Sequence, residues 1–267
     1  MTTLGHHRYS RHVLDRLVEG ARAPGASLGD AERDALGARL RAVPSRERRR
    51  VDAWLVERGA NAPTAFAWSP ARARRALGRG ALRRLTGDPS RTPLAAVTEE
   101  VLDLLARAAT GYVGSGTLAA YLAAVDDATR ALCAAEAVTW ATQTGEAAAT
   151  LSHSWAIPPA DPYYDVPRAR TTLRGQRDLV VRSGADRVVV RVRAGAPGPS
   201  AGPGLRVDLL VDALADPEGT PAARVVGLWP EAGVALSVDG TLEDLRAGAR
   251  AVVRALVAGR RRSLQPA

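Results

Sequence analysis

The sequence predicts an α+β protein: a helical N-terminal region followed by a mixed sheet that helices cover. Three observations predict this class. Apolar residues recur at helical spacing through much of residues 9–144, valine-rich segments begin after Pro158-Pro159, and a final amphipathic segment follows Thr241. With 267 residues, the chain is long enough for one large domain or two smaller ones. We expect a helical, basic region over residues 1–110 and an α/β domain over residues 111–267.

Turn-forming residues divide the helical part. Helices are predicted over residues 9–21, 30–43, 45–59, 70–85, 93–109 and 117–144. Ser69-Pro70 combines an N-cap residue with proline at the first helical position, which is a strong start signal. Asn61-Ala-Pro63 and Gly87-Asp-Pro89 are the breaks on either side of that helix.

The later part of the chain is predicted to contain β-strands. Two hairpins are predicted, from residues 170–182 with 186–193 and from residues 223–229 with 233–238. Residues 195–204 are expected to form a loop, and residues 205–215 fit either a helix or a strand. Thr241 followed by Asp244 resembles a capping box and predicts a last helix that ends at Gly259.

The charged residues are unusual in kind and in placement. All 37 residues of the Lys+Arg count are arginine, which is typical of a GC-rich bacterial genome. A mechanism that needs a Schiff-base lysine, a phosphate-loop lysine or a lysine that orients water is therefore excluded. Residues 1–91 contain 19 arginines and nine acidic residues, whereas residues 92–267 contain 18 and 19. This asymmetry favours a polyanion partner, such as DNA, for the first third.

Composition also bears on the compartment. Cys133 is the only cysteine, so neither an intrachain disulfide nor a cysteine metal cluster is expected. No apolar run approaches the roughly 20 residues of a membrane helix, and the N-terminus has no apolar stretch of a signal peptide. We expect a soluble cytoplasmic protein without a membrane segment and without a cofactor.

Two segments have residues in a suggestive order. Arg174-Gly-Gln-Arg-Asp178-Leu-Val-Val is followed by Val189-Val-Arg191-Val-Arg193-Ala-Gly195. Over roughly residues 117–260, this pattern resembles the PD-(D/E)XK nuclease superfamily, most closely its RecB-type exonuclease branch. The resemblance implies a restriction-endonuclease-like αβββαβ core with an acid on the second strand and an acid-x-lysine on the third. In the family, the acids hold a divalent metal and the lysine helps to place the attacking water.

The departures from this motif concern its charges. Asp178 matches the first acid, but Arg191 stands in place of the second acid and Arg193 in place of the lysine. Because a hard cation needs oxygen ligands, two guanidinium groups make a poor metal site. The resemblance therefore implies a vestigial motif with no catalytic residue, and it leaves enzymatic activity uncertain but disfavoured.

Three aspartates offer another possibility. If residues 205–216 are helical, Asp208, Asp212 and Asp216 lie along one face. They are then either a solvated helix edge or displaced metal ligands, in which case Asp178, Asp208 and Asp212 are the alternative set.

Arginines suggest two binding surfaces. A possible anion pocket contains residues from both strand segments, namely Arg174, Arg177, Arg191 and Arg193; salt bridges to nearby aspartates are the alternative. A possible nucleic-acid-binding stripe follows the helix that starts at Pro70, namely Arg72, Arg75, Arg79 and Arg83; a solvated face is the alternative.

These features together favour a non-catalytic nucleic-acid-associated protein on an inactivated nuclease-like scaffold, for example an accessory subunit in DNA processing. Two alternatives stay open. One is a protein-interaction scaffold that does not bind nucleic acid, and the other is a divergent metal-dependent nuclease.

Overall fold

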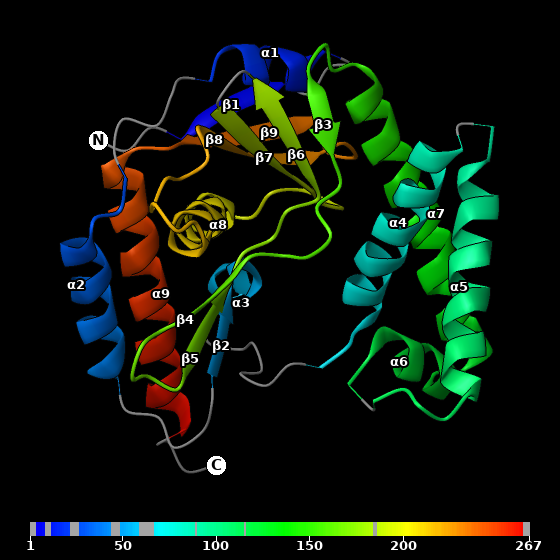
Figure 1. Ribbon diagram of the computed structural model, residues 1–267, viewed down its shortest axis with the longest axis horizontal. Helices are drawn as coiled ribbons and strands as arrows, with labels where there is room; N and C mark the ends of the chain where they lie inside the picture. Colours follow the sequence, from blue (N-terminus) through cyan, green and yellow to red (C-terminus); the bar gives the residue numbers. More distant parts are fainter. Residues whose placement is uncertain are drawn as a thin grey trace. The chain divides into compact units, whose positions relative to one another are not determined.

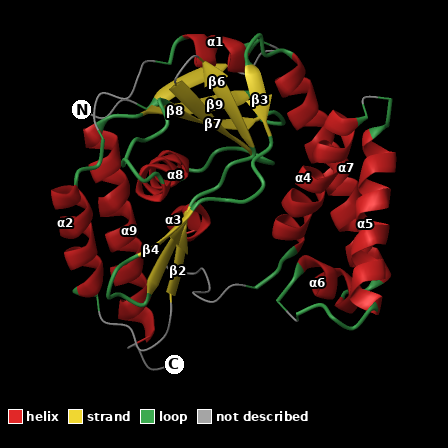
Figure 2. Cartoon of the chain, in the orientation of Figure 1, coloured by secondary structure: helices red, strands yellow, loops and turns green. Residues whose placement is uncertain are grey.

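The structure is a computed structural model that describes residues 4–8, 12–21, 27–43, 49–58, 67–88, 90–114, 116–183 and 186–263. In this range the chain is a mixed α/β protein with two sheets, consistent with the predicted α+β class (Figures 1 and 2). It forms two compact units, one of residues 1–65 with 151–267 and the other of residues 66–150. The predicted boundary between residues 110 and 111 lies inside the second unit. No described helix is long and apolar enough to cross a membrane.

The unit of residues 66–150 is helical. Its helices are α4 (Pro70–Gly87), α5 (Pro93–Ala109), α6 (Leu118–Ala124) and α7 (Asp127–Ala149). The Ser69 side chain caps α4 by accepting a hydrogen bond from the backbone N–H of Arg72 (3.4 Å), as the sequence predicts. The single helix expected over residues 117–144 is wrong. Asp126 divides it, since its carboxylate accepts a hydrogen bond from the N–H of Thr129 (2.7 Å) and so starts α7.

The larger sheet of the other unit has six strands. They are β1 (Gly5–Arg8), β3 (Ser154–Ala156), β6 (Leu179–Ser183), β7 (Asp186–Val192), β8 (Arg224–Trp229) and β9 (Val234–Asp239). Their order is β1-β9-β8-β7-β6-β3, and every neighbouring pair is antiparallel except β7 and β8. The hairpins β6–β7 and β8–β9 confirm the two predicted pairings. The parallel pair is joined through α8 (Ala201–Ala215), because parallel strands need a crossover.

The smaller sheet corrects two predictions. Its strands are β2 (Arg49–Asp52), β4 (Tyr163–Asp165) and β5 (Thr171–Arg174), in the order β2-β5-β4. Residues 49–52 were expected in a helix but form a strand parallel to β5, and α3 (Ala53–Arg58) follows directly. The expected strand over residues 170–182 is two strands in different sheets. It breaks at Gly175, where a Cβ would lie 2.9 Å from Pro162 Cγ.

Helix α8 is the centre of this unit. It contacts strands of both sheets as well as α3 and α9 (Leu242–Ser263), and Figure 1 shows it between the sheets. Most of its side chains are buried in the main apolar core, so the segment that fitted either a helix or a strand is a core helix. The helix begins at Ala201, which puts residues 201–204 in its first turn and not in the predicted loop.

Two further helices come from the N-terminal part of the chain, α1 (Val13–Glu19) and α2 (Asp30–Arg41), and α9 comes from its C-terminal part. The capping box is confirmed: Thr241 Oγ1 accepts from the N–H of Asp244 (3.1 Å) and donates to that residue's carboxylate (2.8 Å). Helix α9 continues past Gly259, so the predicted end there is wrong.

Gly78 allows the packing of the helical unit to be tested. A Cβ on this α4 residue would overlap the indole of Trp140 in α7. We expect Gly78→Ala to lower the free energy of unfolding by about 1–3 kcal/mol, because overpacking forces neighbouring groups to shift. Gly87→Ala is the matched control, since nothing lies within 4 Å of its Cβ. Urea unfolding measures both variants, and equal stabilities would contradict this packing.

A buried arginine–carboxylate site

Asp178, Arg191 and Arg193 lie together at the open end of the β6–β7 hairpin. Asp178 immediately precedes β6, Arg191 lies in β7, and Arg193 follows β7. The Asp178 side chain is buried, and its Oδ2 accepts a hydrogen bond from the N–H of Val192 (2.8 Å). The N–H of Asp178 in turn donates to the carbonyl of Val190 (2.8 Å). This carboxylate therefore fastens the start of one strand to the end of the other.

Arg191 is a fully buried cation, only 1% exposed. Its Nη2 donates to Glu57 Oε1 of α3 (3.1 Å), and its Nη1 donates to Asp208 Oδ2 of α8. The other oxygen of Asp208 accepts from the N–H of Gln176 (2.8 Å). A charge is tolerated in a protein interior only when counter-charges and hydrogen bonds surround it, and the two terminal nitrogens of Arg191 meet that condition.

Arg193 extends the same network. Its Nη2 donates to Glu57 Oε2, and its Nη1 donates to the side-chain carbonyl of Gln176 (3.3 Å). Burial and, to a smaller extent, the positive charge of Arg191 lower the pKa of Arg193 to about 10. Glu57 thus serves both arginines. Nothing in the sequence marks this residue as a partner, because it lies 134 positions before Arg191.

We call Glu57, Arg191, Arg193 and Asp208 the internal cation site. It contains two guanidinium groups and two carboxyl groups. Burial raises the pKa of Asp208 to about 7, although Arg191 opposes this rise. The carboxylate oxygens that could bind a divalent ion here face guanidinium nitrogens, so these residues do not fit a metal. Among the described residues, no three His, Cys, Asp or Glu side chains are grouped so as to hold a metal ion.

Asp212 belongs to a second ion-pair cluster one helical turn further along α8. Its Oδ1 lies 2.6 Å from Arg177 Nη2, and its Oδ2 accepts from Arg187 Nη2 (2.9 Å). Asp208 and Asp212 are both buried, so the solvated-edge interpretation is wrong for them. They do share a helix, as expected. The alternative metal set of Asp178, Asp208 and Asp212 is divided among different partners.

The predicted anion pocket is also divided. Arg191 and Arg193 face acids of the internal cation site, and Arg177 pairs with Asp212. Arg174 is exposed on β5, in the smaller sheet. Pairing with aspartates was the alternative for these arginines, but the partners differ from those expected.

The four arginines of the expected stripe do share α4, yet their exposure differs. Arg79 is buried, Arg72 and Arg75 are half-buried, and only Arg83 is exposed. They therefore do not form one continuous exposed surface. Nucleic-acid binding through this helix stays a prediction.

The structure instead gathers arginines from distant segments on the smaller sheet. Arg174 is the register partner of both Asp52 and Tyr163, and the side chain of Tyr163 is 59% exposed. Arg168 and Arg170, in the turn before β5, are exposed too. We call the following residues the basic sheet face: Arg50, Tyr163, Arg168, Arg170 and Arg174. Arg50 is half-buried and pairs with Asp52 (3.8 Å), and the exposed Asp165 lies on the same side of β4 as Tyr163. Sequence reasoning missed this face because β2 was expected to be helical.

The raised pKa of Asp208 predicts a pH dependence of stability. An acid whose pKa is raised by folding stabilises the fold fully below its unfolded value near 3.8, and this contribution is lost as the pH rises through 7. Relative to Asp208→Asn, the native chain should lose about 2–4 kcal/mol of unfolding free energy between pH 4 and pH 8. Chemical denaturation across this range measures the difference. A difference that does not change with pH would contradict the assignment.

Asp178 thus joins β6 to β7 through hydrogen bonds, and Arg191 and Arg193 at the end of β7 pair with Glu57 and Asp208. Comparisons of the chain with protein-family models, with curated proteins and with solved structures find no match.

Proposed function

We propose that this chain is a non-catalytic nucleic-acid-associated protein, built on a nuclease-like scaffold in which an arginine takes the place of a divalent metal ion. The observation that carries the proposal is the position of Arg191. Its guanidinium group is buried between the carboxylates of Glu57 and Asp208, at the end of the β6–β7 hairpin where Asp178 precedes β6.

The order of elements supports the scaffold. Helix α7 precedes β3, β6 and β7, which pair antiparallel in that order, and α8 then leads to β8, parallel to β7. This succession along the chain is compatible with the αβββαβ order of the nuclease superfamily if β4 and β5 are an insertion and if α7, which belongs to the other compact unit, is counted as the first helix. On this comparison, Asp178 immediately precedes the second strand and Arg191 lies in the third.

The charges of the site support the loss of hydrolysis. A catalytic metal ion activates a water molecule and stabilises a leaving oxygen, and both roles need an open coordination position. A guanidinium group supplies positive charge and hydrogen bonds but cannot bind and ionise water in that way. In this site, the nitrogens of Arg191 are directed at Glu57 and Asp208.

The basic sheet face supports contact with nucleic acid. Its arginines present forks of donors that match phosphate oxygens, and such contacts bind a backbone without reading sequence. Tyr163, the register partner of Arg174, adds an exposed ring on which a base can stack. An accessory role in DNA processing agrees with both properties.

The metal-replacement part of this proposal predicts a rescue by metal. Arg191→Ala should lose about 3–5 kcal/mol of stability, because buried carboxylates are left without their counter-charge. We expect Mn²⁺ or Mg²⁺ to restore part of this loss, with a rise in melting temperature, since an ion that binds only the folded state stabilises it. The native chain and Arg254→Ala, which alters an exposed arginine of α9, should show no such rise. A native chain that cleaves plasmid DNA with either ion, with cleavage abolished in Asp178→Ala, would sink the proposal.

Binding to nucleic acid is tested by gel shift with circular duplex DNA and with single strands at several salt concentrations. Changing Arg168, Arg170 and Arg174 together to alanine should weaken binding and flatten its salt dependence by up to about three counterions. The matched control changes three exposed arginines of other helices, Arg39, Arg250 and Arg254. If both triple variants lose the same amount of DNA affinity, the binding depends on net charge and not on the basic sheet face. No binding by the native chain at low salt would leave the protein-interaction scaffold as the better hypothesis.

A further inference from the structure

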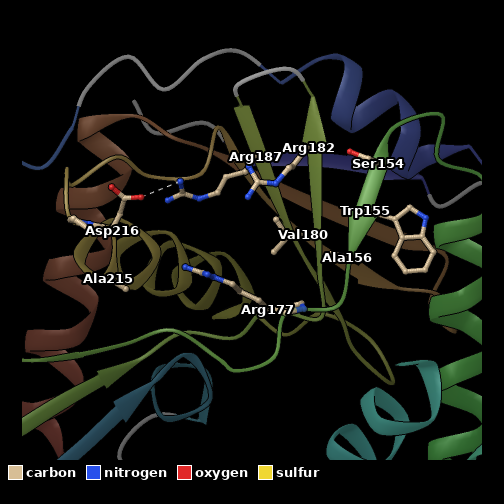
Figure 3. Close-up of a pocket in the computed structure, with 11 residues that line it drawn as sticks. Ser154, Trp155, Ala156, Arg177, Val180, Arg182, Arg187, Ala215 and Asp216 are labelled. Carbon is tan, nitrogen blue, oxygen red and sulfur yellow. Dashed lines mark ion pairs between the residues drawn. The ribbon is translucent and has the colours of Figure 1, made fainter. Parts of the chain in front are cut away.

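A pocket of about 580 Å³ lies beside the C-terminal end of α8, at the turn end of the β6–β7 hairpin. Figure 3 shows its basic character: Arg182 and Arg187 lie side by side, with Ser154 on the neighbouring strand and Arg177 below. Ligand pockets of proteins typically have volumes of this order. The internal cation site lies at the other end of β7, so this pocket is a separate feature.

Two of these arginines are already paired. Arg187 donates to Asp212 through Nε (3.2 Å) and Nη2 (2.9 Å), and its Nη1 lies 3.3 Å from Asp216 Oδ2. Its Nη2 also donates to the carbonyl of Thr220 (2.7 Å). Arg177 shares the carboxylate of Asp212. These acids hold both guanidinium groups in fixed positions.

Arg182 differs from them. Its side chain is exposed, and no described residue pairs with its guanidinium group. It is also the direct register partner of Arg187 in the antiparallel β6–β7 ladder. Like charges directly opposite each other are destabilising, and of the three arginines only Arg177 and Arg187 pair with Asp212 and Asp216. One positive charge is therefore left uncompensated at Arg182.

The surroundings of Arg182 favour a phosphate over a simple ion. Ser154 is its register partner on β3, so the hydroxyl lies on the same face of the sheet. A tetrahedral phosphate accepts hydrogen bonds from a guanidinium fork and a hydroxyl approaching from different directions. Val180, two residues before Arg182 on β6, gives the pocket an apolar wall for the rest of a ligand.

We infer that this pocket binds a phosphate monoester, with the phosphate between Arg182 and Ser154 and its organic part along Val180. The phosphate can belong to a free nucleotide or to the phosphorylated end of a nucleic-acid strand. The site does not depend on the basic sheet face or on the replaced metal ion.

Isothermal titration of the full chain tests the inference, with inorganic phosphate, a nucleoside 5′-monophosphate and the unphosphorylated nucleoside as probes. We expect the two phosphates to bind and the nucleoside to bind far more weakly. Arg182→Ala should weaken phosphate binding about tenfold or more, and Ser154→Ala a few-fold. Arg182→Lys, which keeps the charge without the fork, should fall between the native chain and Arg182→Ala. Arg254→Ala removes the same charge from an exposed position on α9 and should leave binding unchanged.

Oligonucleotides with a 5′-phosphate or a 5′-hydroxyl distinguish the two sources. Tighter binding of the phosphorylated strand, lost in Arg182→Ala, would identify a strand end; binding of the mononucleotide alone would identify a free nucleotide. Absence of phosphate binding by the folded native chain would overturn the inference, as would equal losses in Arg182→Ala and Arg254→Ala. Circular duplex DNA has no terminal phosphate, so its binding tests the proposed function separately.

Discussion

The contact of Arg191 with Glu57 and Asp208 constrains the architecture of the larger unit. A buried guanidinium group must be satisfied from several sides, and here α3 and α8 supply the two carboxylates. The contact joins a segment near the N-terminus to a strand and a helix far along the chain. Gly204 in the first turn of α8 makes the approach possible, because a Cβ there would overlap the Glu57 carboxylate. The core helix, the strand β7 and the N-terminal segment are thus fixed in one arrangement.

A helix as apolar as α8 can hold aspartates only if the surrounding structure neutralises them. Arg191 and Arg187 are four residues apart on β7, and their partners Asp208 and Asp212 are four residues apart on α8. Four residues span about 13 Å along a strand and about 6 Å along a helix, so the long arginine side chains must converge. The two ion pairs therefore specify how far the helix lies along the strand. Apolar packing alone is less selective about such sliding, since similar side chains can replace one another.

Sequence reasoning predicted the elements whose signals are local. Ser69-Pro70 starts α4, the valine-rich segments form β6 and β7, and Thr241 caps α9. It failed for β2, because four residues become a strand only by pairing with β5 more than 100 residues later. The site was predicted only in part, because its contacts also join residues that are far apart in the sequence. The reversal of charge at Arg191 and Arg193 is visible in the sequence, but Glu57 becomes their partner only through tertiary contact.

The positive excess of the first 91 residues has more than one structural role. Arg79 is buried in the structure, whereas Arg50 of β2 lies in register with Thr172 of β5 and so joins exposed arginines from a later segment. A count of charges along the sequence cannot separate these roles, since burial and strand pairing decide which guanidinium groups reach solvent. The smaller sheet thus brings Arg50 of β2 together with arginines of residues 168–174. On the smaller sheet, exposed arginines and the exposed ring of Tyr163 lie together.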